Sequence, residues 1–249
     1  MPAVFVHGVP ESDAIWGPLL AELNREDTIC LSPPGFGAGV PDGWTATRVE
    51  YLGWLVGELE KIEGPIDLVG HDWGAGHVAG VVATRPDLIR SWATDCGGLL
   101  HRDYVWHDLA QVWQTPEAGE ELVAVMASGT VEERAERYVG LGLPDQVAVS
   151  VAEASTPVMS DCILRLYRSA AQPALAEFGA TIGTASARPG LSLFPTEDPY
   201  AGPVEQYREV AELSGATMVT LEGAGHWWQA ATPAPAAAAL EEFWASLDD

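Results

Sequence analysis

The chain of 249 residues carries 12 basic and 36 acidic side chains, which gives a formal net charge of −24. A charge of this sign repels phosphate backbones and anionic lipid, so we expect neither a nucleic-acid partner nor a membrane partner. The three cysteines, Cys30, Cys96 and Cys162, are widely spaced and odd in number; they indicate neither a disulfide framework nor a zinc site and favour a reducing cytoplasm, and no metal or other cofactor is expected.

Short apolar, β-branched runs alternate with longer stretches of helical spacing, the pattern of a parallel sheet covered by helices. The N-terminal segment MPAVFVHG has no basic region and too short an apolar run for a signal peptide or a membrane span. Strands are expected near residues 3–7, 27–31, 66–70, 90–95, 190–195 and 217–222. Helices are expected near residues 15–24, 47–62, 74–84, 204–214 and 233–247, the last with Thr232 as N-cap and Pro233 at its first position.

Residues 100–180 interrupt this alternation. Segments such as GEELVAVMAS (119–128) and SDCILRLYRSAAQ (160–172) have helical patterns, and no convincing strand accompanies them. We therefore expect a core domain made of residues 1–99 and 181–249, with residues 100–180 inserted into it as a helical cap before the fifth strand.

The stretch VGHDWGAG (69–76) ends the third expected strand and begins a helix. Glycines stand two positions before and two positions after Asp72, which is the spacing of a nucleophile elbow, a turn too tight for larger residues. Such a turn points Asp72 out of the carboxyl edge of the sheet. Aspartate is also a frequent helix cap, so the motif alone is compatible with either role.

The loop after the first strand, HGVP (7–10), ends close to the same edge of the sheet. The backbone N–H groups of Val9 and Trp73 are expected to form an oxyanion hole there. His7 follows Phe5 by two positions on an apolar strand, and we interpret it as structural.

Two further loops supply the partners that a nucleophile needs. FPTEDP (194–199) ends the fifth strand with Asp198, and GAGHWW (223–228) follows the sixth strand with His226. The chain order nucleophile, acid, histidine predicts a catalytic triad of Asp72, Asp198 and His226. Taken separately, Asp198 also fits an ordinary turn and His226 a packed loop histidine.

These motifs together resemble the α/β-hydrolases. Within that fold, HGVPES (7–12) and GHDWGA (70–75) resemble the epoxide hydrolases and the related haloalkane dehalogenases, and the resemblance covers nearly the whole chain. It implies an α/β-hydrolase fold with a mostly parallel sheet of about six strands flanked by helices, because the two strands that usually precede the HG motif are missing. The edge so created leaves homodimerisation open.

An aspartate nucleophile indicates attack on a saturated carbon, since a carboxylate is ionised near neutral pH and a serine suits acyl transfer. We expect hydrolysis of an epoxide to a vicinal diol through a covalent ester on Asp72, which is then hydrolysed by water that His226 activates with the help of Asp198. The acidic chain favours a small, neutral, mainly apolar substrate.

The leaving oxygen of an epoxide needs a proton, which cap tyrosines supply in the resembling enzymes. LYRSAA (166–171) resembles the late tyrosine-arginine segment of that cap, so Tyr167 is the expected donor, although an aromatic in the apolar pattern ILRLYR also fits a core position. Leu109 lies near the place of the usual first tyrosine. The second donor therefore stays open among Tyr104, Tyr138 and His107.

The alternative activity is haloalkane dehalogenation with the same triad. Trp73, with Trp106 or Trp113 of the cap, would then bind halide through indole N–H groups, but position 9 is valine where many of those enzymes have asparagine. Asp95 lies near the position of the acid in some dehalogenases, and Asp198 matches better. The candidate substrate-binding residues are Trp106, His107, Trp113 and Tyr138.

Three other functions are less favoured. A haloacetate dehalogenase would need arginines beside the nucleophile, where this chain has Trp73 and Gly76. An esterase would be expected to use serine. A non-catalytic binding protein, which this fold also provides, would not need the full set of nucleophile, acid, base and oxyanion donors.

Overall fold

The computed structural model describes residues 1–184 and 187–247. Residues 185–186 and 248–249, which belong to the expected core segment 181–249, lie outside the described residues. The described chain contains one six-stranded, all-parallel sheet in the order β2-β1-β3-β4-β5-β6. Its strands are β1 Ala3–Val6, β2 Thr28–Leu31, β3 Ile66–Gly70, β4 Ile89–Thr94, β5 Gly190–Pro195 and β6 Ala216–Leu221. The expected parallel sheet of about six strands is confirmed.

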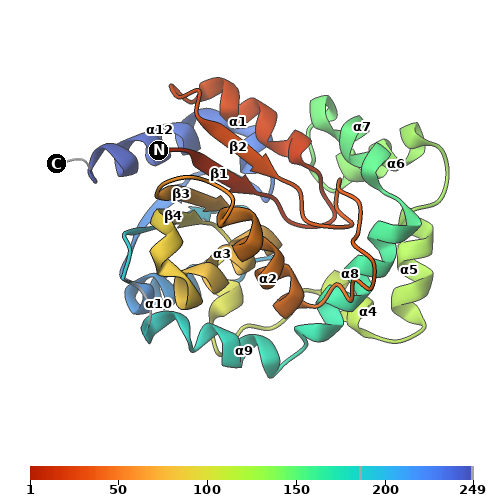
Figure 1. Ribbon diagram of the computed structural model, residues 1–249. Coiled ribbons are helices and arrows are strands. Elements are labelled where there is room, and N and C mark those ends of the chain that lie inside the picture. The colour runs from red at the N-terminus through yellow and green to blue at the C-terminus, as the bar shows by residue number, and fades with distance from the viewer. Residues whose placement is uncertain (185–186, 248–249) are drawn as a thin grey trace.

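Helices cover both faces of this sheet (Figure 1). The helices that flank it are α1 Gly17–Glu22, α2 Arg48–Leu59, α3 Trp73–Thr84, α10 Val204–Ser214, α11 Trp228–Ala231 and α12 Pro233–Ala245. Short 3₁₀ helices are formed by Asp13–Trp16, Pro86–Leu88, Gly97–Leu100 and Ile182–Thr184. Thr232 and Pro233 begin α12 as expected, but the Thr232 side chain makes no capping hydrogen bond.

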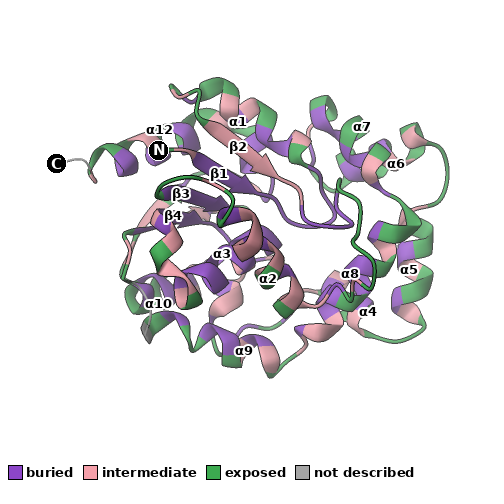
Figure 2. Cartoon of the chain, viewed as in Figure 1, coloured by how far each residue is buried: buried purple, intermediate pink, exposed green. Residues whose placement is uncertain are grey.

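Alternate residues of a strand pack on opposite faces of the sheet. In β1, Ala3 and Phe5 join a buried cluster with α1 and α12, whereas Val4 and Val6 join another with α2 and α3. Because both faces are covered, the central strands are mainly apolar, and the buried Asp67 of β3 is paired with Arg90 and Ser91 of β4. Figure 2 shows β1 and β3 buried and the edge strand β2 only half-buried.

Between β4 and β5, all regular structure in the described chain is helical. The helices after the short 3₁₀ helix Gly97–Leu100 are α4 Asp108–Gln114, α5 Ala118–Met126, α6 Val131–Gly140, α7 Asp145–Ala154, α8 Pro157–Ser169 and α9 Ala174–Gly179. Figure 1 shows α4 to α8 together at one end of the sheet. Buried side chains of α4 and α8 share a cluster with Val9 of the loop after β1 and Trp73 of α3, so the division into core and cap domains stays a prediction.

Within the described residues, no individual helix has the length and apolar composition needed to cross a membrane. The pair α7 and α8 meets those two criteria jointly, with a bend of 91° at the break between them.

Candidate active site

Asp72 lies in a strained turn between β3 and α3. Its backbone has φ 51° and ψ −120°, a conformation that costs a residue other than glycine about 1–3 kcal/mol. A Cβ atom at Gly70 would lie 2.6 Å from the Gly74 carbonyl oxygen, and one at Gly74 would lie 2.0 Å from the Val6 carbonyl oxygen. The turn therefore requires both glycines of the predicted elbow. The Asp72 side chain makes no capping bond to α3, so helix capping does not account for this residue.

The Asp72 carboxylate faces the loop after β1. The Val9 N–H donates to Asp72 Oδ1 at 2.8 Å, and a Cβ atom at Gly8 would lie 2.1 Å from the same oxygen. Trp73 is the first residue of α3, where backbone N–H groups have no partner within the helix. The Val9 N–H thus faces the Asp72 carboxylate as the expected oxyanion hole requires, and the role of the Trp73 N–H stays a prediction.

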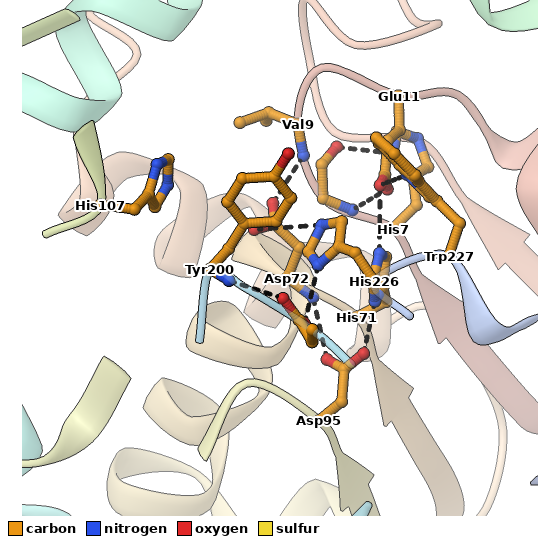
Figure 3. A network of polar contacts seen from close by, with 12 residues as sticks. His7, Val9, Glu11, His71, Asp72, Asp95, His107, Tyr200, His226 and Trp227 are labelled. Carbon is orange, nitrogen blue, oxygen red and sulfur yellow. Dashed lines mark hydrogen bonds and ion pairs between the residues drawn. The ribbon is translucent and has the colours of Figure 1, made fainter. Parts of the chain in front are cut away.

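His226, which Figure 3 shows beside Asp72, comes from the loop after β6, and Asp198 comes from the loop after β5. His226 Nδ1 lies 2.9 Å from Asp198 Oδ2, and His226 Nε2 lies 4.0 Å from Asp72 Oδ2. The second oxygen of Asp198 accepts the Tyr200 N–H at 2.8 Å. The fold thus brings together the three residues whose order along the chain suggested a triad.

The pKa values of these three groups are shifted by burial and by each other. Burial raises the pKa of Asp72 to about 6, against the positive influence of His226. Burial opposes the charged form of His226, but the Asp198 carboxylate outweighs it and raises the pKa of the imidazole. Burial would also raise the pKa of Asp198, but the charge of His226 and its hydrogen bond lower it. Asp198 is therefore held ionised beside the histidine.

A network of three charged side chains, Glu11, His71 and Asp95, lies fully buried beneath the elbow. His71 Nδ1 lies 2.5 Å from Asp95 Oδ2, and His71 Nε2 lies 3.1 Å from Glu11 Oε1. Burial disfavours the imidazolium, but Asp95 and Glu11 raise the pKa of His71 well above its usual value. The pKa of Glu11 falls to about 2 and that of Asp95 is also lowered, in both cases because His71 outweighs burial. His71 is thus an imidazolium between two carboxylates.

This network of charged side chains links the loops that carry the site. Glu11 Oε2 accepts the Gly8 N–H at 3.0 Å, and Asp95 Oδ1 accepts the Asp72 N–H at 3.0 Å. The indole N–H groups of Trp227 and Trp228, which follow His226, donate to Glu11 at 2.6 Å and to Asp95 at 2.5 Å. Sequence reasoning assigned no role to Glu11 or His71. Their position in glycine-rich loops at strand ends was the available signal, because a charged residue there is buried only if it is paired.

A pocket opens beside Asp72 and His226. Its apolar lining includes Leu109, Trp113, Met126, Leu141 and Trp227, and its other polar lining residues are His107, Tyr167 and Tyr200. Among the described residues, no lysine or arginine lines this pocket. The pocket is therefore suited to a neutral, mainly apolar molecule.

Tyr167 comes from α8 and is 2% exposed. Its ring packs against Trp113, Trp73 and Trp106 with centroid distances of 4.7, 5.3 and 5.3 Å. Burial, reinforced by Asp72, raises the pKa of the phenol well above its usual value. The hydroxyl is therefore a donor at every pH near neutrality.

The four candidate substrate-binding residues separate into two pairs. His107 and Trp113 line the pocket. The His107 Nδ1 accepts the Ala110 N–H as the N-cap of α4, and burial lowers the pKa of this histidine to about 4, so the neutral ring keeps its proton on Nε2. Trp106 and Tyr138 lie outside the pocket lining: Trp106 packs against Trp73, and Tyr138 belongs to the cluster around α6 and α7.

The hydroxyl groups of the two tyrosines considered as second donors are engaged elsewhere. Tyr138 shares a hydrogen bond with Ser155 at 2.6 Å, and the Tyr104 hydroxyl donates to the Tyr200 carbonyl at 2.7 Å. Tyr200 itself was not singled out from the sequence. Only its place two positions after Asp198 could have drawn attention to it.

Some ligand-type atoms in the site lie close enough together to hold a metal ion. Those of Glu11, His71 and His226 lie within 4.8 Å of one another. Both ring nitrogens of His71 are already paired with carboxylates, and His226 Nδ1 is paired with Asp198. We therefore assign these donors to one another rather than to an ion.

Comparisons with known proteins agree with this architecture. A family model described as the alpha/beta hydrolase family matches residues 3–239. Among curated proteins, (E)-2-((N-methylformamido)methylene)succinate hydrolase of Acinetobacter baylyi is 30% identical over 94 residues, which are 37% of this chain and 36% of that protein. The match thus spans about a third of the curated relative.

Solved structures of similar fold cover nearly the whole chain. A candidate epoxide hydrolase from Pseudomonas aeruginosa has a TM-score of 0.77 and 18% identity, covering 99% of this chain and 89% of that one. A loop variant of the haloalkane dehalogenase DbeA from Bradyrhizobium elkanii has a TM-score of 0.72 and 16% identity, with coverages of 98% and 90%. An E-2-(acetamidomethylene)succinate hydrolase has a TM-score of 0.75 and 19% identity, with coverages of 98% and 91%. At these identities the likeness shows the fold alone.

Proposed function

The chain belongs to the alpha/beta hydrolase family, and from that membership and the site geometry we propose that it hydrolyses an epoxide to a vicinal diol. One observation carries the proposal: the residue at the strained elbow is a carboxylate, Asp72, and not a hydroxyl. A carboxylate displaces a leaving group from saturated carbon and becomes an alkyl ester, whereas a serine forms an acyl-enzyme.

In the first half-reaction the two oxygens of Asp72 have different tasks. Oδ1 is held by the Val9 N–H at 2.8 Å, and Oδ2 is on the side of His226. We assign Oδ2 as the atom that attacks the epoxide carbon. The ring C–O bond breaks, its electron pair passes to the ring oxygen, and Tyr167 transfers its proton there.

In the second half-reaction water attacks the ester carbon of Asp72. The 4.0 Å between His226 Nε2 and Asp72 Oδ2 exceeds a hydrogen bond, so this ring nitrogen is not committed to the carboxylate and can accept a proton from that water. His226 takes the proton of the water, Asp198 stabilises the imidazolium, and the Val9 and Trp73 N–H groups bind the oxyanion. One such donor contributes typically about 10²–10³ in rate.

The charges favour this sequence of events. Asp72 in its ionised form is one of the groups that raise the pKa of His226. Ester formation removes that charge, so the neutral imidazole becomes more favoured when it has to act as a base. When the intermediate collapses, the alkoxide of the product takes the proton of His226. The proton released as Asp72 regains its ionised carboxylate restores the hydroxyl of Tyr167, so the cycle consumes only epoxide and water.

The proposed substrate is small, neutral and mainly apolar. The pocket lining offers aromatic and aliphatic surface and has no lysine or arginine to pair with a carboxylate, which argues against a succinate of the kind named for two of the similar proteins. The net charge of −24 also disfavours anions. We further propose a cytoplasmic protein with residues 100–180 as its cap; the free thiols of all three cysteines support the location.

Haloalkane dehalogenation is the second candidate. It is favoured by Trp113, which lines the pocket and whose buried indole N–H has no hydrogen-bond partner among the described residues. An indole N–H suits a halide leaving group. Both activities would form the same ester on Asp72, so the leaving group must be tested directly.

The His226→Gln variant tests the proposed intermediate. After incubation with styrene oxide, mass spectrometry is expected to find an adduct on the peptide that contains residues 69–76, and the Asp72→Ala variant is expected to remain unmodified. With the wild-type protein, diol from styrene oxide and bromide from (2-bromoethyl)benzene are measured side by side. Bromide without diol would select the second candidate, and absence of any adduct would refute the covalent mechanism.

A further inference from the structure

Tyr200 is held by its backbone on both sides. Its N–H donates to Asp198 Oδ1 at 2.8 Å, and its carbonyl accepts the Tyr104 hydroxyl at 2.7 Å. The first bond ties it to the carboxylate that orients His226, and the second ties it to the segment before α4. A residue fixed at both peptide groups loses little further freedom when it binds a ligand.

The ring of Tyr200 is also fixed. It lies between two imidazoles, with centroid distances of 5.0 Å to His226 and 4.9 Å to His107 and with its plane steeply inclined to both. Figure 3 shows it in front of Asp72, on the side of the site that faces His107, and it lines the same pocket as Tyr167. Its hydroxyl makes no hydrogen bond to any of the described residues. The anchored backbone and packed ring therefore present a free phenol to the space where a substrate of Asp72 must lie.

We propose that Tyr200 is the second hydroxyl donor to the oxygen that leaves when the epoxide ring opens. The inference deepens the proposed function and rests on it. Tyr167 transfers its proton to that oxygen while Tyr200 donates a hydrogen bond, so that the C–O bond of the ring breaks as the ester bond to Asp72 forms. Charge that develops on the oxygen is stabilised best by donors already in place.

The protonation state of Tyr200 fits this role. Burial, and after it the charges of Asp198 and Asp72, raise the pKa of the phenol. The hydroxyl therefore keeps its proton throughout the neutral range. Its hydrogen bond strengthens as the oxygen becomes negative, and the step needs no additional proton source.

The other donor candidates are less well placed. The hydroxyl groups of Tyr104 and Tyr138 are already committed to the Tyr200 carbonyl and to Ser155. His107 lies on the side of Tyr200 away from His226 (Figure 3), and its ring is fixed as the N-cap of α4. Tyr104 thus becomes a positioning residue for Tyr200.

The test compares two leaving groups on one carbon skeleton. In the His226→Gln background, ester formation on Asp72 is timed by rapid quench and mass spectrometry with styrene oxide and with (2-bromoethyl)benzene. Tyr200→Phe keeps the ring and removes the hydroxyl. We expect about 10²-fold slower ester formation from styrene oxide and an unchanged rate from the bromide, which leaves without a proton. Tyr138→Phe, which removes a hydroxyl outside the pocket, is the matched control and is expected to change neither rate.

Each alternative gives a different result. Equal slowing with both substrates would show that Tyr200 only supports the shape of the site, and no slowing with either would show that its hydroxyl is idle; both overturn the inference. Selective slowing of epoxide opening by His107→Ala, with Tyr200→Phe unaffected, would assign the role to His107 instead. If the background variant itself forms no ester with styrene oxide, the proposed function fails, and this inference fails with it.

Tyr104→Phe provides a second variant that leaves Tyr200 unaltered. Loss of the bond to the Tyr200 carbonyl is expected to slow epoxide opening by a smaller factor, on the order of 3 to 10, as a lost hydrogen bond of about 1 kcal/mol predicts. The bromide reaction should again be unchanged. If Tyr104→Phe slowed both reactions, the result would contradict the inference. This test remains valid even if the Tyr200→Phe variant does not fold, which circular dichroism would detect.

Discussion

The carboxylate of Asp95 accepts the backbone N–H of Asp72 at 3.0 Å. The acid at the end of β4 therefore holds the elbow in place and does not pair with His226. Its other oxygen bonds the imidazolium of His71 and the indole of Trp228. Strained backbone persists only where its surroundings over-determine it, and this buried acid supplies part of that support.

Replacing Asp95 should therefore affect stability first. Asp95→Ala leaves the His71 imidazolium with only Glu11 as a counter-charge and removes the acceptor for the Asp72 N–H, so we expect a loss of about 3–5 kcal/mol in the free energy of unfolding. Asp95→Asn keeps an oxygen for that N–H and should lose less. Denaturant unfolding of both variants measures the difference. Wild-type stability of the alanine variant would show that the elbow does not depend on this acid.

The raised pKa of Asp72 predicts where the rate of the proposed reaction falls on the acid side of its pH profile, which is the acid limb of the reaction. Only the ionised carboxylate attacks, and its pKa is about 6 because burial opposes ionisation. The value of kcat/KM for styrene oxide, which reports steps through ester formation, should fall about tenfold for each pH unit below that value. A limb near pH 4, as for an ordinary exposed carboxyl group, would contradict the burial that the structure shows.

A pair of histidine variants identifies the source of this limb. The positive charge of His71 lowers the pKa of Asp72, so His71→Gln should move the limb to higher pH. His77 is also buried, but burial and the nearby Arg48 lower its pKa to about 3. It is thus neutral near pH 6, and His77→Gln should leave the limb in place. Equal behaviour of the two variants would mean that His71 carries no charge.

Space around the nucleophile gives a steric prediction. A methyl group at Gly8 would lie 2.1 Å from Asp72 Oδ1, whereas one at Gly76 would approach no atom closer than 3.7 Å. Gly8→Ala must displace the carboxylate and should lower the rate of ester formation by more than about 10²-fold, the factor that misplacement of about 1 Å can cost. Gly76→Ala should keep activity and stabilise α3 by up to about 1 kcal/mol. Equal activities of the two variants would exclude close packing at Gly8.

The choice between the two acids near His226 can be tested kinetically. Asp198 is the hydrogen-bond partner of His226, and Asp95 is occupied by His71 and Trp228. Asp198→Asn should slow ester hydrolysis by about 10²–10⁴-fold and leave ester formation nearly intact, so that the alkyl-enzyme accumulates during turnover. Mass spectrometry of the quenched steady state detects it. Unchanged turnover would mean that His226 needs no carboxylate partner or pairs with a different one.

The sequence by itself determined the sheet and the elbow, because both depend on local patterns. Strand periodicity placed all six strands to within one residue at each end. The spacing of the two glycines around Asp72 marked the turn, although the contact that requires Gly74 comes from Val6 of β1. The sequence also predicted that Asp72, Asp198 and His226 lie together, since each follows a strand and all strands of a parallel sheet end at one edge.

Only the tertiary structure decided which polar groups meet at that edge. Glu11, His71 and Asp95 come from three different loops, and their pairing depends on how the loops pack together. Helical spacing alone did not show that Tyr167 faces a pocket while Tyr138 bonds Ser155. Tyr200 stands out only because the bond to its carbonyl and its two ring contacts come from distant segments. Local propensity determines where helices and strands form. Long-range packing, together with the need to pair every buried polar group, determines which polar side chains meet at the ends of the strands.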